Sequence, residues 1–250
     1  MGVRTYFRSP AALAWTALAA VGVWATVVAG WQLAFTLASG TAIAESAFLG
    51  GLGAVVLVGV VAGATLSVAA AIWLPCSAAI AYAVGRRVRG DSAGFARTVR
   101  VVRARSEPLY RWAKTTVAVG GIADRILTAE DTAPGEVAAG CGGFVVPALV
   151  LDAARLSSAV DRANRVVPTP GRRRTRAIGA AGTTLLVVGA GGVGVVAERV
   201  PSLPAEVAVP GPIPAVAVAL LVGVVVTAAV DTAWRASAYA SADLHEGFSR

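Results

Sequence analysis

The stretch that decides the fold is Gly140-Cys-Gly-Gly-Phe-Val-Val-Pro147-Ala-Leu-Val-Leu-Asp152, which is apolar, contains a proline and ends at an aspartate. After Asp152 the apolar residues recur at helical spacing up to Val167, with arginines between them. This change of pattern predicts a membrane-buried helix that turns into an amphipathic helix lying along the membrane surface. The same design occurs earlier in the chain, around Pro75.

Composition places the chain among integral membrane proteins. Of its 250 residues 56% are hydrophobic and 14% are charged, and the mean hydropathy is +0.71. A soluble domain carries about 25% charged residues, so this chain could not cover its surface with polar groups. The two cysteines, Cys76 and Cys141, lie in apolar runs, where a small buried hydrophobic residue is the expected role.

The apolar segments predict an all-α membrane helix bundle with six spans. Ala11 to Ser39 carries no charge and is too long for the apolar core of a cleavable signal peptide, about 7–15 residues. We expect a single membrane domain, residues 1–250, in which two cytoplasmic basic segments, 85–108 and 152–176, form amphipathic helices. The predicted spans cover residues 11–38, 54–84, 109–127, 137–151, 177–197 and 213–233.

An alternative fold has four spans plus a re-entrant hairpin formed by the third and fourth segments. At about 1.5 Å per residue, Trp112–Leu127 and Val137–Leu151 reach only about 24 and 22 Å, whereas the hydrocarbon core of a bilayer is about 30 Å thick. Flanking residues and local thinning accommodate short spans, so we favour six. The hairpin would leave the rest of the topology unchanged.

The distribution of charge predicts the orientation. All 22 lysine and arginine residues except Arg125 and Arg199 fall on one side of the predicted spans. Basic residues mark the cytoplasmic side, so we expect both termini and both basic segments in the cytoplasm of a cell whose plasma membrane holds the protein. The aromatic residues near this boundary are typical of an interfacial belt: Tyr6, Tyr82, Tyr110, Tyr239, Trp112 and Trp234.

Two features of the basic segments suggest a binding role. Each segment follows a proline inside a span, Pro75 or Pro147, where we expect helix kinks. Each also carries the pattern Arg-x-x-Arg-Val-Val, which indicates either a twofold repeat or chance in a chain rich in arginine and valine. The predicted contacts for lipid headgroups are Arg97, Arg100, Arg162 and Arg165, because arginine near an anionic surface binds lipid phosphate. A role in orientation alone is the other interpretation.

Motifs for catalysis are missing from the sequence. Gly189 to Gly194 matches the dinucleotide fingerprint G-x-G-x-x-G, but the helix that would follow meets Pro201 within a few residues. Small residues at this spacing suit close packing of membrane helices. His245 is the only histidine, and no hydrolase or metalloprotease motif occurs. We therefore predict no enzymatic activity, no cofactor, no metal site and no nucleic-acid partner.

Two functional classes remain open. The first is a non-catalytic membrane scaffold or lipid-associated protein whose working surface is the pair of basic helices. The second is a transporter or permease for an uncharged or small substrate, with a path near the kinks at Pro75 and Pro147. A cavity between the spans lined by Ser77, Thr115, Thr116 and Thr183 would favour this class. The predicted partners are membrane lipids, with anionic headgroups, and a second copy or another membrane protein stays open as a partner.

Three short segments carry a resemblance to a known group of proteins. They are Arg4-Thr-Tyr-Phe-Arg-Ser-Pro10, the central Phe144-Val-Val-Pro-Ala-Leu-Val-Leu-Asp152 with its helix to Val167, and the tail Trp234-Arg-Ala-Ser-Ala-Tyr-Ala240. In layout the chain resembles uncharacterised six-span families of prokaryotic, including archaeal, integral membrane proteins that are described only as domains of unknown function. The resemblance implies the six-span fold and brings no functional residues.

Overall fold

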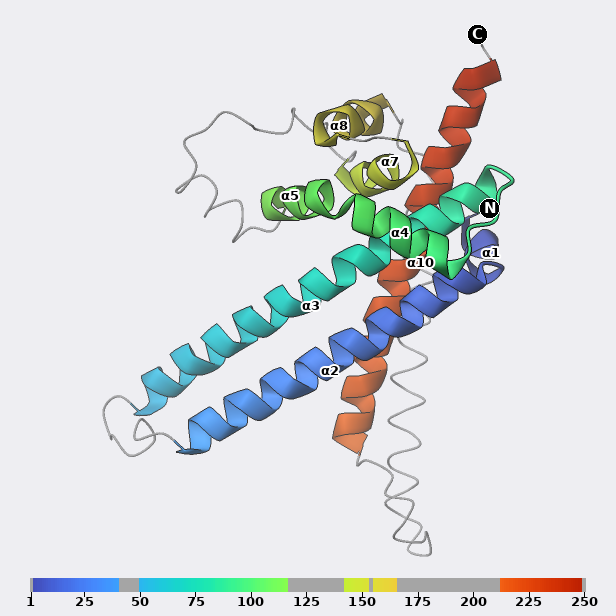
Figure 1. Ribbon diagram of the computed structural model, residues 1–250. Helices are drawn as coiled ribbons and strands as arrows, with labels where there is room; N and C mark the ends of the chain where they lie inside the picture. The colour runs from blue at the N-terminus through green and yellow to red at the C-terminus, as the bar shows by residue number, and fades with distance from the viewer. Residues whose placement is uncertain (1, 41–49, 117–141, 153–154, 166–211, 249–250) are drawn as a thin grey trace, which may run out of the picture.

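The computed structural model describes residues 2–40, 50–116, 142–152, 155–165 and 212–248, and all regular structure within these ranges is helical. Three long helices dominate (Figure 1): α2 (Pro10–Gly40), α3 (Gly50–Val88) and α10 (Pro212–Phe248). The short helices are α1 (Gly2–Phe7), α4 (Phe95–Ala104), α5 (Ser106–Thr116), the 3₁₀ helix η1 (Gly142–Phe144), α7 (Val145–Leu151) and α8 (Leu156–Arg165).

The three long helices are apolar enough to cross a membrane. The stretches that qualify are Pro10–Leu37, Val55–Val88 and Val218–Ala242, and they coincide with the spans predicted at 11–38, 54–84 and 213–233. Within hydrocarbon a helix satisfies its own backbone polar groups, so uncharged runs rich in alanine, valine and leucine form such helices. The prediction of an all-helical fold is confirmed for the described residues, and the three long apolar helices are compatible with a membrane protein. The predicted span 177–197 lies outside the described residues.

The described residues cover only parts of the third and fourth predicted spans, so these two spans stay predictions. Residues 109–116 belong to α5, where Glu107, Arg111 and Lys114 at three- and four-residue spacing give the helix a polar face. Residues 142–151 form only η1 and α7, about 15 Å of helix, and α8 follows at a bend of 120°. Residues 117–127 and 137–141 lie outside the described residues.

The two prolines occupy different positions in their helices. α3 continues through Pro75 as one helix from Gly50 to Val88. Pro147 is the third residue of α7, and in the first turn of a helix the missing N–H costs no hydrogen bond. The chain bends after α7, before α8 begins, and the kinks at Pro75 and Pro147 stay predictions.

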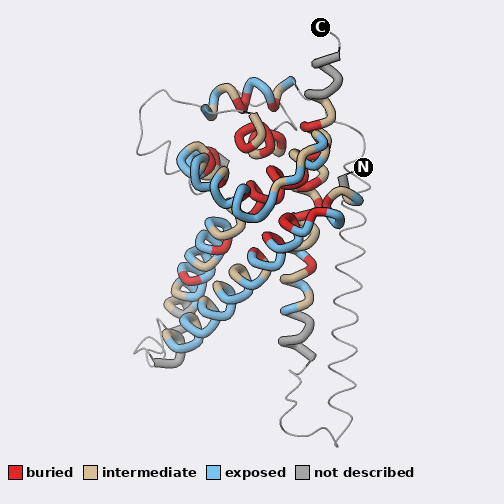
Figure 2. Tube along the Cα trace, turned by 45° about the vertical axis from the view of Figure 1, so that its right-hand side comes forward, coloured by how far each residue is buried: buried red, intermediate tan, exposed pale blue. Residues whose placement is uncertain are grey.

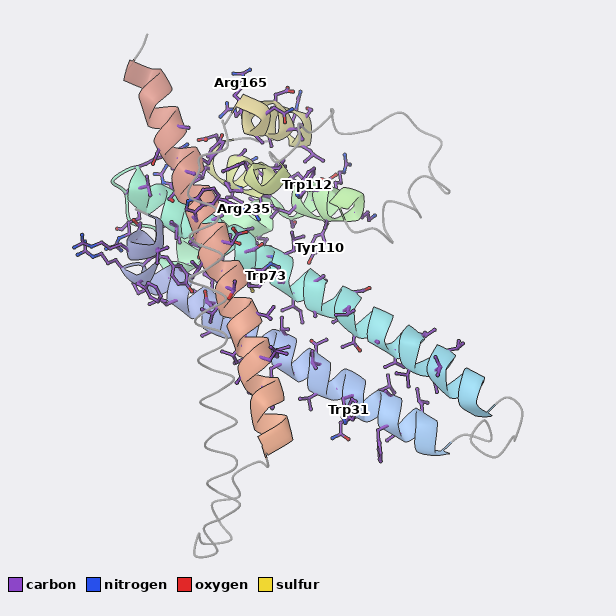
Figure 3. The ribbon with its side chains drawn as sticks, turned by 180° about the vertical axis from the view of Figure 1, so that it is seen from behind. Trp31, Trp73, Tyr110, Trp112, Arg165 and Arg235 are labelled. Carbon is purple, nitrogen blue, oxygen red and sulfur yellow. The ribbon has the colours of Figure 1, made fainter. Side chains whose placement is uncertain are left out.

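α2 and α3 lie side by side as a hairpin (Figure 1) and touch along a stripe of small residues. A Cβ atom added to Gly22 would lie 2.9 Å from Ile72 Cγ2, and one added to Gly30 would lie 2.1 Å from Thr65 Oγ1. Small residues at such positions let two membrane helices approach closely. Much of the remaining hairpin surface is exposed and apolar, for example Trp31 near its far end (Figure 3).

Buried side chains concentrate where the short helices gather (Figure 2). We call this region the arginine end; it comprises α1, the first turns of α2, the last turns of α3 and α10, and helices α4, α5, η1, α7 and α8. Every residue from Cys76 to Val84 is buried here, and Ala229, Ala233, Ala236 and Ala240 bury one face of α10. The arginine end is therefore a packed protein core at one end of the long helices.

Candidate functional site

All the basic side chains that the structure describes lie at the arginine end. No lysine or arginine occurs between Pro10 and Gly85, or in α10 before Arg235. The described basic residues are Arg4, Arg8, Arg86, Arg87, Arg89, Arg97, Arg100, Arg103, Arg105, Arg111, Lys114, Arg155, Arg162, Arg165 and Arg235. This concentration of positive charge makes the arginine end the candidate functional site.

Asp152 is the centre of a polar cluster that ties four helices together. Its carboxylate accepts two hydrogen bonds from Arg89, Nη1 to Oδ1 at 2.6 Å and Nη2 to Oδ2 at 2.7 Å. Tyr239 of α10 interacts electrostatically with the same carboxylate, and Arg162 Nη1 lies 3.9 Å from Oδ2. Both side chains of the Asp152–Arg89 pair are only 15% exposed. The cluster joins the end of α3 to α7, α8 and α10.

The environment of Asp152 lowers its pKa. Burial acts to raise the pKa of this carboxyl, but the hydrogen bonds and charge of Arg89, with Tyr239 and Arg162, outweigh burial and hold the pKa below its ordinary value of 3.8. A carboxyl whose folded-state pKa is lowered stabilises the fold above its ordinary pKa, and this contribution disappears as the pH falls through the folded-state value.

We therefore expect a pH-dependent difference between the wild type and the Asp152→Asn variant. At neutral pH the wild type should melt at a higher temperature, and the gap should narrow as the pH falls below 3.8, because protonation removes the charge that the variant already lacks. Thermal unfolding of both proteins in detergent across pH 7 to 3 measures the gap. A difference in melting temperature that stays constant over this range would contradict the stabilising role of the ionised Asp152 carboxylate.

A second ion pair shapes the turn between α3 and α4. Arg86 and Asp91 form an ion pair, and Arg97 Nη1 lies 3.2 Å from the same carboxylate. Gly90 has a φ of +84°, a backbone conformation that favours glycine. The hydrogen bond from Arg86, together with the charges of Arg86 and Arg97, outweighs desolvation and lowers the pKa of Asp91. This turn directs α4 back over the ends of α3 and α2.

α4 is anchored to the first turns of α2 by aromatic and polar contacts. The indole N–H of Trp15 donates to Thr98 Oγ1 at 2.7 Å, and Thr98 is fully buried. The ring of Phe95 stacks on that of Trp15 with a centroid distance of 4.8 Å. Trp15 belongs to the candidate span Pro10–Leu37, so α4 lies beside the first turns of this candidate span.

α10 carries its own ion pair at the arginine end. Arg235 pairs with Asp231 one turn earlier, as their i, i+4 spacing predicts. The guanidinium lies over Gly143, where an added Cβ would be 2.1 Å from Nη1. The ring of Phe144 lies against the ring of Trp234, with 6.2 Å between the ring centroids. Gly143 therefore leaves room for the side chain of Arg235 where η1 packs on α10.

The four arginines predicted to contact headgroups have different surroundings. On α4, Arg97 is half exposed and pairs with Asp91, and Arg100 is exposed. On α8, Arg165 is exposed at the last position (Figure 3), whereas Arg162 faces the Asp152 cluster. All four lie at the arginine end, but Arg162 has a structural role that the sequence pattern did not indicate.

The apolar stripe of α8 does not face lipid as we expected. Ala159, Val160 and Ala163 are fully buried, and Leu156 is half buried. α8 packs on α7, with a smaller contact to α5, so its stripe faces protein. Val167, the last predicted member of the stripe, lies outside the described residues. An amphipathic pattern alone cannot distinguish a protein-covered face from a lipid-covered one.

The predicted aromatic belt needs a similar correction. The six aromatic residues lie at the arginine end, but Tyr6, Tyr82, Tyr239 and Trp112 are 8% exposed or less. Their rings fill the core, and Tyr6 also shares a hydrogen bond of 2.7 Å with Thr16. Tyr110, at 45% exposed (Figure 3), is the member with the most accessible ring.

Comparisons with protein-family models, with curated proteins and with solved structures give no match for this chain. The resemblance to six-span prokaryotic membrane families therefore stays a prediction.

Proposed function

We propose that this chain is a non-catalytic, multi-pass membrane protein that associates with anionic lipids through its arginine end. The observation that carries the proposal is the separation of charge: within the described residues, the basic side chains gather at one end of three apolar helices. Each arginine near an anionic surface contributes about 1 kcal/mol of attraction. The basic excess also favours placing this end in the cytoplasm of a plasma-membrane protein.

Four carboxylates of the described residues support a structural role for the polar groups. Asp91, Asp152, Asp231 and Glu107 each form an ion pair with an arginine. Carboxylates that serve as acids, bases or metal ligands usually converge on one site, whereas these are distributed over separate pairs. The pairs fix helices to one another, which favours the scaffold class over an enzyme.

The transporter alternative receives no such support. Among the four predicted polar residues, the structure describes the side chain of Ser77. This side chain is buried, and its hydroxyl donates a hydrogen bond of 2.8 Å to the Leu74 carbonyl of the same helix. A hydroxyl satisfied in this way contributes little to a path for a polar substrate.

For the topology we propose four membrane crossings in place of six. α5 ends at Thr116 and η1 begins at Gly142. Both helices lie at the arginine end, and α5 contacts α7 and α8, so the residues on either side of segment 117–141 lie on the same side of the long helices. α8 ends on that side, whereas α10 starts at Pro212, away from the arginine end (Figure 1). One crossing between Arg165 and Pro212, in the apolar segment 177–197, would connect them. This is the alternative with a hairpin in place of the third and fourth spans.

Cysteine-accessibility labelling of the reconstituted protein tests this topology. We expect single cysteines at Ser92 and at both termini to react only with a reagent on the inner side. Cysteines at Thr41 and Ser202 should react from outside, and a cysteine at Thr132 should be protected from the external reagent. Labelling of Thr132 from outside would establish six crossings instead.

Native mass spectrometry of the purified protein tests the functional proposal. We expect the lipids that co-purify to be enriched in anionic phospholipids relative to the membrane of origin, because the positive charge of the arginine end attracts them. Bound lipid with the same composition as the surrounding membrane would contradict the proposal.

A further inference from the structure

The two basic helices differ in what covers their apolar sides. On α8 the apolar residues are buried against protein, as described above. On α4, Thr98 and Val102 are buried, but Phe95 is 46% exposed and Val99 is 39% exposed. These two residues stand one turn apart on the same flank of the helix. α4 therefore presents an apolar strip that the rest of the described protein leaves open.

The position of this strip places it beside the membrane. Phe95 stacks on Trp15, and Trp15 donates to Thr98 on the buried side of α4. Trp15 is the sixth residue of α2, only about 8 Å along the helix from its start. An apolar strip at this depth lies at the boundary between headgroups and acyl chains, where interfacial helices bury their apolar faces.

The charge next to the strip is positive. Successive residues of a helix are rotated by about 100° around its axis. Viewed along α4, Arg103 and then Arg100 therefore lie next to Val99, on the side away from the core. Both side chains are exposed, and neither forms an ion pair within the described part of the chain. α4 contains no acidic residue, and Asp91, the nearby acid, is paired with Arg86 and Arg97. An anionic headgroup is the complementary partner.

We propose that α4 is the lipid-contacting helix of the arginine end, with Phe95 and Val99 in the interface and Arg100 and Arg103 on the phosphates of anionic phospholipids. α8 is instead a structural helix that closes the Asp152 cluster. This inference rests on the proposed function and assigns its binding site. Anionic lipid is recognised by α4 and not by α8.

The first test is a lipid titration of the full-length protein in detergent, followed by native mass spectrometry with phosphatidylglycerol and with phosphatidylcholine. The Arg100→Gln/Arg103→Gln variant should bind phosphatidylglycerol about fivefold more weakly per arginine lost. The matched control, Arg155→Gln/Arg165→Gln at α8, removes two exposed arginines and should bind like the wild type. Equal losses in the two variants would overturn the assignment to α4.

The two proposals fail in different ways in this titration. A wild type that binds both lipids equally contradicts the proposed function itself. A wild type that prefers phosphatidylglycerol, together with an α4 variant that binds like the wild type, overturns only the inference. Because all four arginines are exposed, we expect unchanged melting temperatures, which verify that each variant is folded.

The second test measures depth and does not depend on charge. A fluorescent label on Val99→Cys, in a background with Cys76 and Cys141 replaced by alanine, should be quenched by lipids that carry a quencher near the headgroup. The same label on Ser157→Cys, an exposed position of α8, should be quenched by iodide in the aqueous phase. A Val99 label that iodide quenches as strongly as the Ser157 label would overturn the inference and favour an acidic protein as the partner of α4.

Discussion

Replacing Asp152 with asparagine should destabilise the arginine end by about 3 kcal/mol, the lower limit for breaking a buried ion pair by removing one partner. The variant would leave the Arg89 guanidinium in a site that is only 15% exposed, without the carboxylate that accepts its two hydrogen bonds. Thermal or denaturant unfolding in detergent measures the loss. A disulfide engineered between Gly85 and Leu151, which lie in contact, should form more slowly in the variant, because α7 docks less well on α3.

Two further variants separate the ion pair from other effects. The Arg89→Met/Asp152→Leu double variant should recover much of the stability, since replacing both members of a buried pair with apolar residues is often neutral. Arg111→Gln breaks the pair with Glu107, whose side chains are 70% and 74% exposed, and should cost less than about 1 kcal/mol. A loss for Arg111→Gln as large as that for Asp152→Asn would contradict the special role of the cluster.

Replacing Gly30 with alanine should separate α2 from α3 over the middle of the hairpin. The added Cβ would lie 2.1 Å from Thr65 Oγ1, 2.7 Å from Cγ2 and 3.0 Å from Cβ. Because the obstruction includes the β-branched base of Thr65, rotation of its side chain cannot relieve it, and one helix has to move. Overpacking of this kind costs about 1–3 kcal/mol, and unfolding in mixed detergent micelles measures it.

Gly63→Ala is the matched control for this substitution. Gly63 lies on α3, in the same hairpin, and an added Cβ there meets no protein atom within 4 Å. The change in helix propensity is the same at both positions and favours alanine, so Gly63→Ala should leave stability unchanged or raise it. Adding Thr65→Gly to Gly30→Ala should restore the close approach. A Gly30→Ala variant as stable as the wild type would show that the two helices do not pack through this stripe.

The sequence predicted the membrane class and three of the long helices, because an uncharged run of this length has few other structures available. It also predicted that the basic residues collect at one end. The sequence is less informative where charged and apolar residues alternate. Residues 109–116 are the described part of the third predicted span, and Arg111 and Lys114 give this part, in α5, a polar face.

The candidate site was predicted only in outline for a related reason. Hydrophobic periodicity gives the direction of an apolar stripe but not the identity of what covers it, so Val99 and Val160 look alike in the sequence although one is exposed and the other fully buried. Asp152 stood out as the end of an apolar run, but its partner Arg89 is 63 residues away. The aspartate at a helix boundary and the arginine just beyond the end of α3 were the only signals of this pair.

The hairpin of α2 and α3 has a mechanical consequence. It diverges from α10 away from the arginine end (Figures 1 and 2), so it resembles a lever held at its base by Trp15, Thr98 and Phe95. From Trp15 to Gly40 the lever is about 38 Å long, and a rotation of about 5° at the base moves its tip by about 3 Å. A bilayer that becomes thinner or thicker changes the tilt of long helices. In this protein the resulting torque would act on the contact that anchors α4.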